Sequence, residues 1–426
     1  MATSISRTLR AIQNMDEKHN IAELIKKIHR KTAQGIQHDS FPTEDMASAE
    51  GQQRRLDFLK KETARELPVL CGNQKAITDL KTLEGNIENY IGMTQVPTGV
   101  IGPLRVLGSA AEGDFYVPLA TSEGALVASY HRGAKASRLS GGITSICMIE
   151  AVQRSPVFKF NNLAELGTFM MYAIQNIELF KTITEQTSRF AKLFDVIPNI
   201  EGNHLMLTFE YQTGDAAGQN MVTLCTDAVC KHLLDKAPVK PVYWFIEGNY
   251  SGDKKATALS FTTVRGKKVT AEAEIPRPIV EKVLKSTPEM VAEYWQTSTV
   301  GVIQSGAIGA QGHFANGLAA LFLATGQDVA CVSEAAVGIT RMEVTSSGAL
   351  YASATLPNLI VGTVGGGTSL PTQRECLELM DCYGAGKARK LAEICGALVL
   401  SGELSIAAAL SAGHFSSAHK KFGRKK

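Results

Sequence analysis

Residues 204–211 read HLMLTFEY, and apolar and more polar side chains alternate along this stretch. Because successive side chains of a strand point to opposite faces, this period of two predicts a half-buried strand. Helical patterns flank it, over 161–179 and 188–194 before the strand and again after Gly218. Strands and helices mixed in this way predict a separate α+β unit over about 156–246.

The composition of the chain changes on either side of this unit. The N-terminal part is charged, poor in glycine and helical in pattern, as in IAELIKKI at 21–28, which predicts a small helical domain. From Asn89 onward, glycines and prolines separate short β-branched runs, as turns between strands require. The fold class is therefore α+β: a helical N-terminal domain, and a large α/β domain interrupted by the inserted unit. The predicted boundaries are 1–87, 88–155, 156–246 and 247–426.

The length, the net charge and the cysteine pattern argue against several classes of protein. With 426 residues, of which 44% are hydrophobic, the chain is too long for one core and should divide into domains. A formal charge of +3 gives no reason to expect nucleic acid or an anionic membrane as the main partner. The eight cysteines are scattered through apolar segments without a metal-binding spacing, which is typical of reduced thiols in a reducing compartment.

Neither end of the chain predicts a membrane segment or a secretory signal. The longest weakly polar stretch, 394–413, is interrupted by Glu403 and several glycines, so we expect no membrane span there. The first fifteen residues contain Arg7 and Arg10 but no continuous apolar region. We expect a cytoplasmic protein, with a mitochondrial presequence as the minor alternative.

Four segments place an ionisable residue beside glycine or at the end of an apolar run. They are ATSEGALVAS at 120–129, GNYSGDKK at 248–255, ATGQD at 324–328 and AAALSAGHFSSAH at 407–419. A carboxylic acid, a lysine, an aspartate and a histidine are the parts needed to reduce an acyl thioester. The four segments suggest that chemistry jointly, whereas each one alone has an ordinary structural explanation.

Together the four segments resemble hydroxymethylglutaryl-CoA reductase, in a class I-like form, and the resemblance covers nearly all of the chain after about residue 85. It implies reduction of (S)-3-hydroxy-3-methylglutaryl-CoA to mevalonate and CoA by two NADPH, in the mevalonate pathway of isoprenoid biosynthesis. It also implies that the inserted unit is a small ferredoxin-like dinucleotide-binding domain. Eukaryotic members commonly carry an N-terminal membrane anchor, and we expect none in this chain.

The resemblance gives catalytic roles to Glu123 and Lys254. Taken alone, Glu123 would be a first-turn glutamate stabilised by a helix N-terminus, and Lys254 a solvated loop lysine. In the resembled family the matching glutamate is the acid that hydrogen-bonds the reacting carbonyl oxygen, so it must be protonated near neutral pH. The matching lysine is the cation that faces the thioester oxygen while hydride arrives.

Asp328 and His419 complete the implied catalytic set. Asp328 follows Gly326, a helix C-cap for 316–325, and by itself would be a turn aspartate. In the family it bridges the glutamate and the lysine, which would favour the ammonium form and raise the pKa of Glu123. His414 and His419 are five apart and cannot form an i, i+4 metal pair, so we expect no metal site.

The resemblance assigns the second histidine, His419, as the acid that protonates the departing CoA thiolate. A group of pKa about 6.5 can pass a proton to a thiolate of pKa about 8.5. The basic tail that follows could be a frayed end or a flap that closes over the nucleotide.

The resemblance also marks positions that contact the substrate. Arg154 and Lys255 match residues that hold its free carboxylate, a task suited to charge-assisted hydrogen bonds. The substrate-pocket positions are Arg154, Asn249, Asp253, Lys255, His313 and Asn316, and His313 could equally be a packing residue. The matching CoA contacts are Ser129, Arg132 and Ser405. His131 and Thr297 replace the Asn and Lys usual in anchored members, which leaves the fine CoA contacts open.

No GxGxxG fingerprint is present, so an ordinary Rossmann site is disfavoured. Two glycine segments match the family's nicotinamide-dinucleotide motifs instead, TGDAAGQNM at 213–221 and GTVGGGT at 362–368. Free backbone N–H groups at a helix start are suited to phosphate oxygens. The predicted cofactor residues are Ser188, Arg189, Asp215, Gly218, Asn220, Val364, Gly365, Gly366, Gly367 and Thr368. Ser188 and Arg189 match the pair at the 2′-phosphate, which favours NADPH over NADH.

The family arrangement places the active site between two protomers, with the strand ENYIG at 88–92 at the interface. We therefore expect a homodimer or homotetramer and an inactive monomer. Lys425 stands where a regulatory serine would be, so phospho-control of that kind is not expected. The rival hypotheses are a non-catalytic CoA- or dinucleotide-binding protein and a reductase of another acyl-CoA; Arg154 and Lys255 argue against the second.

Overall fold

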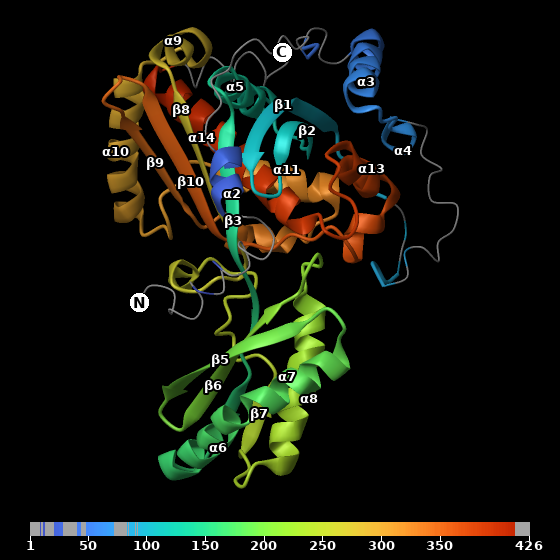
Figure 1. Cartoon of the computed structure of the whole chain (residues 1–426), viewed down its shortest axis with the longest axis vertical. Coiled ribbons are helices and arrows are strands. Elements are labelled where there is room, and N and C mark those ends of the chain that lie inside the picture. The colour runs from blue at the N-terminus through green and yellow to red at the C-terminus, as the bar shows by residue number, and fades with distance from the viewer. Residues whose placement is uncertain are drawn as a thin grey trace.

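Strand β3 (Ile143–Arg154) runs through both halves of the molecule in this computed structural model (Figure 1). The structure describes residues 9, 12, 21–28, 41–43, 48–71, 83, 85–89, 91 and 93–413. Residues 144–151 of β3 pair with β8 (Gly266–Ile275) in the larger half, and residues 152–154 pair with β6 (His204–Gln212) in the smaller half. One continuous strand therefore links the two halves.

The larger half is built on the strands β1, β2, β8, β9 and β10. β1 pairs antiparallel with β2 and parallel with β3; beyond β3 the order is β8, β10, β9, all antiparallel. The bounds are β1 Thr98–Gly108, β2 Glu112–Ala120, β9 Ile339–Val344 and β10 Leu350–Leu359. The helices and helical turns of this half are α5 Leu126–Leu139, η2 Ala258–Phe261, α9 Arg277–Ile279, η3 Val280–Leu284, α10 Pro288–Ser305, α11 Phe314–Thr325, η4 Val329–Cys331, α12 Val332–Ala335, η5 Gly366–Ser369, α13 Pro371–Leu379 and α14 Ala388–Ser411.

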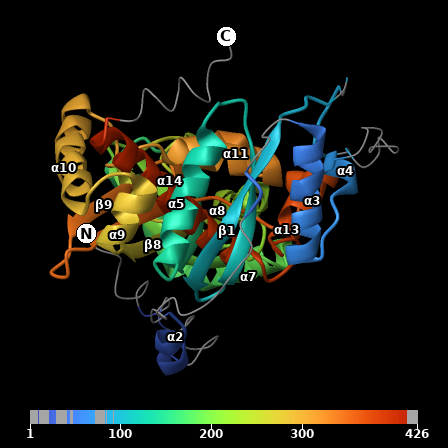
Figure 2. The same ribbon diagram turned by 90° about the horizontal axis from the view of Figure 1, so that it is seen from above.

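Helix α14 forms the centre of this half, beside α5 (Figure 2). By length and apolar composition it could cross a membrane, and it is the one such helix among the described residues. Glu403 and the glycines therefore do not make this segment too short or too polar to cross a membrane, contrary to the expectation from the sequence. However, 83% of its most apolar window is buried inside the protein, and its side chains belong to the main hydrophobic core. Burial identifies α14 as a core helix.

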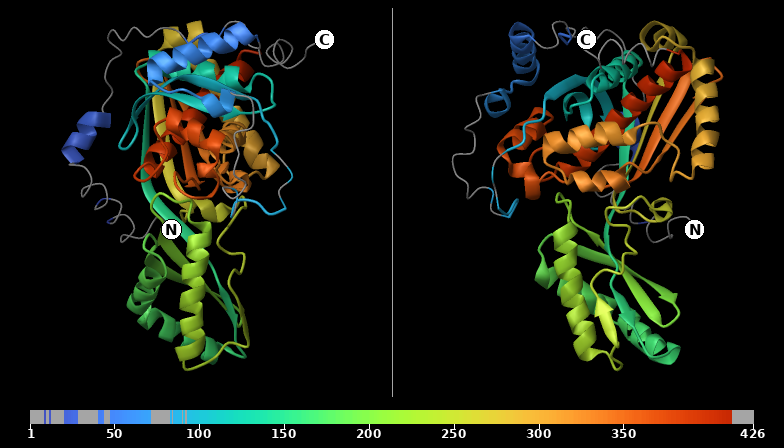
Figure 3. Two further views of the ribbon diagram at one scale, coloured as in Figure 1. Left: turned by 90° about the vertical axis from the view of Figure 1, so that its right-hand side faces the viewer. Right: turned by 180° about the vertical axis from the view of Figure 1, so that it is seen from behind.

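The smaller half extends away from the large one (Figures 1 and 3). Its elements are β4 Val157–Lys159, α6 Leu163–Gln175, α7 Ile177–Thr187, β5 Lys192–Glu201, β6, α8 Gln219–Lys236 and β7 Tyr243–Phe245. β6 lies between β5 and β4, and β4 also pairs with β7, all antiparallel. A separate apolar core fills this half, with Phe158, Phe169, Phe180 and Phe209 completely buried. The predicted strand at 204–211 and the mixed α+β character are confirmed.

The helix predicted over 188–194 is wrong. Helix α7 ends at Thr187, and Ser188 has an extended backbone, with φ −146° and ψ 132°. Its hydroxyl accepts hydrogen bonds from the N–H groups of Phe190 and Ala191, which forms a turn. The chain then enters β5, because nine register pairs with β6 outweigh the local helical pattern.

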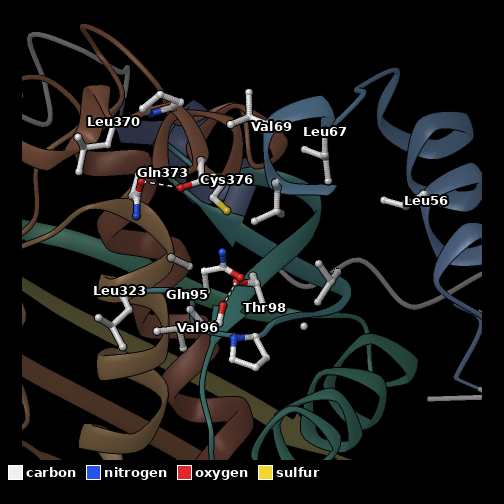
Figure 4. A pocket seen from close by; sticks show the side chains of 18 of the residues that line it. Leu56, Leu67, Val69, Gln95, Val96, Thr98, Leu323, Leu370, Gln373 and Cys376 are labelled. Carbon is white, nitrogen blue, oxygen red and sulfur yellow. Dashed lines mark hydrogen bonds between the residues drawn. The ribbon is translucent and has the colours of Figure 1, made fainter. Parts of the chain in front are cut away.

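The described part of the N-terminal region is helical, as expected, with α2 Ile21–Ile28, α3 Ala49–Thr63 and α4 Pro68–Cys71. A small core of Phe41, Leu59 and Leu67 packs on Tyr116 and Leu379 of the large half. A cavity of about 810 Å³ lies between this N-terminal region and the large half (Figure 4). Leu56 and Leu67 line one side and Leu323 and Leu370 the other. Among the described residues, no predicted site residue lines this cavity.

Candidate active site

Lys254 and Asp328 form an ion pair, as the sequence predicted. Lys254 lies in the loop between β7 and η2, and its Nζ is 2.8 Å from Oδ2 of Asp328. Asp328 follows Gly326, the C-cap of α11, and its carboxylate also accepts the N–H of Ala330 at 3.0 Å. The hydrogen bond to Asp328 raises the pKa of Lys254 above its usual value, so the lysine is an ammonium at neutral pH.

Buried charges surround the base of the Lys254 loop. Arg154 Nη1 contacts Asp253 Oδ2 at 3.1 Å and Glu247 Oε2 at 3.2 Å. The predicted carboxylate-binding arginine therefore has two partners within its own chain. On the other side of Asp253, Oδ1 accepts Arg265 Nη2 at 2.6 Å, and Arg265 Nη1 contacts both oxygens of Glu334 at 2.8 and 2.7 Å. Asp253 is thus held between two guanidinium groups.

Two further predicted residues of this loop are placed on its surface. The side chain of Lys255 reaches back to the carbonyl of Asp253 at 2.9 Å and is otherwise exposed. Asn249 is exposed and has a left-handed backbone with φ +63°. Both are accessible to a ligand that approaches the loop from solvent.

Glu123 lies near the N-terminal end of α11, whereas Lys254 lies near its C-terminal end. It is exposed, and its two carboxylate oxygens accept the Asn316 amide at 3.2 and 3.1 Å. The first-turn alternative is wrong, because α5 starts three residues later at Leu126, after Ala125 in a left-handed conformation. Within the described residues Glu123 is bonded to Asn316 rather than to Asp328.

His313 is fixed by a buried carboxylate that the sequence reading missed. Glu403 of α14 accepts His313 Nδ1 at 3.0 Å, the His313 N–H at 2.8 Å and the Gly312 N–H at 2.7 Å. Burial alone would raise the pKa of Glu403, but these hydrogen bonds outweigh it and the pKa is lowered. The ring of His313 stacks on Tyr130, with centroids 5.2 Å apart. Nδ1 therefore carries a proton, and Nε2 is left to meet a ligand.

Helix α11 separates the two groups of residues. Asn316, which holds Glu123, lies in its first turn, and Asp328, which holds Lys254, follows its last residue, Thr325. The nine residue steps from Asn316 to Thr325 rise about 13 Å along the helix axis. Glu123 and Lys254 therefore contact residues at opposite ends of this helix.

The three predicted CoA residues are brought together from α5 and α14. Ser129 Oγ lies 2.9 Å from Ser405 Oγ, and Arg132 donates to the hydroxyl of Ser405 from Nε at 3.0 Å and to its carbonyl from Nη2 at 2.7 Å. Burial lowers the pKa of Arg132. His131 lies on a different face, where its Nδ1 accepts the Gly102 N–H at 3.4 Å and its ring contacts Phe41. Thr297 is exposed on α10.

The two predicted nucleotide segments touch each other. The N–H of Thr363 donates to the carbonyl of Asp215 at 2.8 Å. The Asp215 carboxylate accepts the N–H groups of Gly386 and Ala388 at 2.7 and 3.0 Å, which caps the start of α14. This predicted cofactor residue is therefore engaged by the backbone of the large half.

The glycine loop lies directly beside the end of α11. A Cβ atom on Gly326 would overlap the carbonyl of Gly367, so only glycine permits this approach. The loop continues through exposed Gly365 and Gly366, half-buried Val364 and buried Thr368, whose hydroxyl donates to the Gly365 carbonyl at 2.7 Å. The predicted nucleotide loop thus adjoins the segment that carries Asp328.

The remaining cofactor residues lie in the smaller half. Gly218 is the N-cap of α8 with φ +87°, and Asn220 is exposed in the first turn of that helix. Ser188 caps α7, and Arg189 is exposed next to the ring of Phe190. His419 and the other tail histidine, His414, lie outside the described residues, as do Tyr90 and Gly92 of the expected interface strand.

Arg265, Glu247, Glu334 and Glu403 are the functional candidates that sequence reasoning missed. Glu334 stands in VSEAAVG and Glu403 in LSGELSIAAAL, and a charge inside an apolar run indicates a buried, paired carboxylate. That signal could have identified both glutamates. Arg265 comes just before GKK and has the sequence context of a surface residue, so nothing local distinguishes it.

A lysine ammonium held by an aspartate, next to a loop with two exposed glycines, is compatible with a cofactor-dependent oxidoreductase. Residues 51–424 match the family described as hydroxymethylglutaryl-coenzyme A reductase. The chain belongs to this family.

Curated relatives agree over most of the chain. A 3-hydroxy-3-methylglutaryl-coenzyme A reductase of Pyrococcus horikoshii is 42% identical over 412 residues, covering 95% of this chain and 98% of the relative. The corresponding protein of Pyrococcus abyssi is 46% identical over 80% of this chain and 85% of the relative. One from Solanum tuberosum is 38% identical over 90% of this chain and 68% of the relative.

Among solved structures, the class II 3-hydroxy-3-methylglutaryl-CoA reductase of Streptococcus pneumoniae, bound to NADPH in open conformations, superposes with a TM-score of 0.65. The match covers 84% of this chain and 96% of the other. At 19% identity this likeness shows the fold alone.

Proposed function

We propose that Lys254, Asp328, Glu123 and His419 carry out the NADPH-dependent reduction of 3-hydroxy-3-methylglutaryl-CoA to mevalonate, the activity of this family. The observation that carries the proposal is the Lys254–Asp328 pair next to the glycine loop at 365–368. The ammonium of Lys254 stabilises negative charge on the thioester oxygen, and Asp328 keeps the lysine protonated. Glu123 donates a hydrogen bond or a proton to the same oxygen.

His419 protonates the CoA thiolate when the C–S bond of the thiohemiacetal, formed by the first hydride addition to the thioester, breaks to leave an aldehyde, and a second reduction converts this aldehyde to the alcohol. Bound NADPH supplies the hydride for each reduction. Ser129, Arg132 and Ser405 contact the CoA portion. Arg154, Asn249, Asp253, Lys255, His313 and Asn316 form the pocket for the acyl portion, in which Nε2 of His313 faces the substrate.

The residues around the glycine loop fit NADPH. Gly365 and Gly366 are exposed with positive φ, and free space surrounds both, so backbone N–H groups can approach phosphate oxygens. The smaller half has the strand order β7-β4-β6-β5 around α6, α7 and α8, the arrangement of a ferredoxin-like unit. We propose that this unit binds the dinucleotide, with half-buried Ser188 and exposed Arg189 at its 2′-phosphate.

We further propose that Glu123 and Lys254 of one active site come from two protomers. The stretch of α11 from Asn316 to Thr325 rises about 13 Å, and the partners of Glu123 and Lys254 lie at its two ends, which supports separate positions for the two side chains in one chain. A second copy that places its Glu123 opposite Lys254 would complete the site and remove water from both. The segment 88–92 is the proposed contact strand, and Ile91 is fully exposed in the single chain. A homodimer is the smallest assembly that satisfies this geometry.

We keep the four-segment division at residues 87, 155 and 246, and a cytoplasmic location, as proposals. The division is supported by two separate hydrophobic cores, one in each half of the chain. Seven described cysteines are buried and unbridged, which suits a reducing compartment.

NADPH oxidation tests the function directly. The purified protein should oxidise about two NADPH for each 3-hydroxy-3-methylglutaryl-CoA, and should be almost inactive with acetyl-CoA, which has no free carboxylate for Arg154 and Lys255. Equal rates with both thioesters would mean a general acyl-CoA reductase. Binding of NADPH without turnover of either would mean a non-catalytic protein.

A further inference from the structure

The loop that presents Lys254 has no regular structure of its own. Between β7 and η2 the chain contains no helix or strand, and Lys254 and Asn249 both have left-handed backbones, with φ +56° and +63°. Such conformations are unfavourable for residues with a side chain and persist only where the surroundings fix them. The contacts that fix this loop therefore decide where the ammonium group lies.

Arg265 is the central contact. It precedes β8, is 1% exposed, and its own N–H is held by the Asn358 side chain at 2.9 Å. One arm of its guanidinium binds Asp253, the residue directly before Lys254, at 2.6 Å. The other arm binds both oxygens of Glu334. A planar fork that uses both arms in this way fixes direction as well as distance.

Glu334 connects this fork to the other half of the ion pair. It lies in α12, six residues after Asp328, and is completely buried. Its Oε1 also accepts the backbone N–H of Lys254 at 3.4 Å. The chain of contacts from Asp253 through Arg265 to Glu334 thus ties the lysine segment to the aspartate segment.

We propose that Arg265 and Glu334 are positioning residues for the proposed reaction: they hold the Lys254 loop at a fixed distance from Asp328, so that the ammonium group is in place before substrate binds. Both side chains are buried, so they act through the loop rather than on the ligand. The proposal rests on the catalytic role given to Lys254 under the proposed function. A displacement of about 1 Å in such a group can reduce a rate by about 100-fold.

A purely structural ion cluster is the competing explanation, and the chain offers a matched control for it. Glu393 of α14 is also completely buried and accepts hydrogen bonds from the Ser109 hydroxyl at 2.5 Å and from the N–H groups of Ala110 and Ala111 at 2.8 and 2.7 Å. It contacts neither the Lys254 loop nor Asp328. Glu393→Gln therefore shows how much the loss of a buried carboxylate alone changes the rate and the stability, without disturbing the Lys254 loop.

The experiment is a double-mutant cycle on the full chain. Single-turnover rates of 3-hydroxy-3-methylglutaryl-CoA reduction are measured for wild type, Glu334→Gln, Lys254→Met and the double variant, with Tm and NADPH affinity for each. Arg265→Lys, which keeps the charge but loses the fork, provides a second independent variant. We expect Glu334→Gln and Arg265→Lys to slow the wild-type enzyme about 10- to 100-fold while NADPH affinity changes less than about twofold. In the Lys254→Met background neither change should slow the reaction further.

Glu393→Gln should lower Tm but leave the rate close to that of wild type. Equal fold-losses from Glu334→Gln, or from Arg265→Lys, in the wild-type and Lys254→Met backgrounds would overturn the positioning role. The same conclusion would follow if Glu393→Gln slowed the reaction as much. Near-normal turnover by Lys254→Met alone would instead refute the proposed role of Lys254 and, with it, the positioning claim.

Discussion

At the C-terminal end of α11, Lys254 is paired with Asp328, and its loop is tied to buried Arg265 and Glu334. At the N-terminal end, Glu123 is exposed and its carboxylate meets the Asn316 amide. Both carry one ionisable group of the proposed reaction. Both groups are exposed, but the cation is paired with a carboxylate on a loop tied to buried charges, whereas the carboxylate of the acid meets a neutral amide.

This difference indicates that the single chain holds the cation of the proposed reaction in place, but not the acid. Preorganised charge is effective because no reorganisation is needed when the oxyanion forms, and the Lys254 end already has that property. A carboxylic acid that donates a proton near pH 7 needs desolvation or a neighbouring negative charge. In the part of the chain that the structure describes, Glu123 is exposed, so in the proposed dimer the substrate and a second protomer would supply the low-dielectric surroundings.

The largest expected effect comes from the Lys254 end. Lys254→Ala should lower kcat for the thioester by about 100- to 1,000-fold, because the developing oxyanion loses its cation. NADPH affinity, measured by fluorescence titration, should change little, since the change falls on the transition state. Near-normal turnover would sink the catalytic assignment.

His419 comes next and tests a single step. His419→Gln should slow reduction of the full thioester by about 100-fold, yet leave reduction of free mevaldehyde close to wild type, because no sulfur leaves in that half-reaction. His414→Gln is the matched control and should act mainly on stability. Comparable losses on both substrates in the His419 variant would assign this residue to cofactor positioning or flap closure instead.

A smaller effect is expected at the edge of the nucleotide-binding half. Arg189→Ala should raise KM for NADPH by about 10- to 100-fold, the equivalent of one charge-assisted hydrogen-bonded pair, and hardly alter KM for NADH. Steady-state kinetics with both cofactors give the comparison. If the two KM values rise equally, Arg189 has a structural role.

A different kind of effect, on stability rather than on activity, is expected with pH at the Lys254 end. Burial raises the pKa of Glu334 to about 7, although Arg265 opposes the shift. Because the folded-state pKa lies above the unfolded value, the stabilisation from the protonated form is complete below about pH 4.5 and is lost as pH rises towards 7. Relative to Glu334→Gln, which cannot titrate, wild type should lose up to about 3 kcal/mol of unfolding free energy across that window. Urea unfolding at a series of pH values measures it, and parallel curves would contradict the shift.

Much of the architecture could be predicted from the chain itself. The alternation over 204–211 and the pattern over 316–325 each correspond to an observed element, because a clear period on one face reflects burial on that face. Residues 188–194 show the limit. Their local helical pattern yields to pairing between β5 and β6, which is a long-range interaction that no local window contains.

The candidate site divides in the same way. Contact between Lys254 and Asp328 could be predicted because both lie in segments that resemble the family, and the ion pair is present. The contact between Arg265 and Glu334 joins residues 69 positions apart, and neither stands in a recognised motif. Glu403 was visible only as an interruption of an apolar stretch, although an unpaired charge there would be too costly to bury. Tertiary partners, rather than residue types, define these roles.

Complementation between two inactive variants tests most directly whether Glu123 and Lys254 of one chain belong to different active sites. Glu123→Gln and Lys254→Met, each carrying a different affinity tag, are co-expressed, and the doubly tagged heterodimer is purified and assayed for NADPH oxidation with 3-hydroxy-3-methylglutaryl-CoA. If the two ends of α11 contribute to different active sites, one of the two sites in the heterodimer retains both residues, and activity should recover to about half of wild type. A heterodimer no more active than its parents would show that Glu123 and Lys254 act within one protomer, contrary to this account.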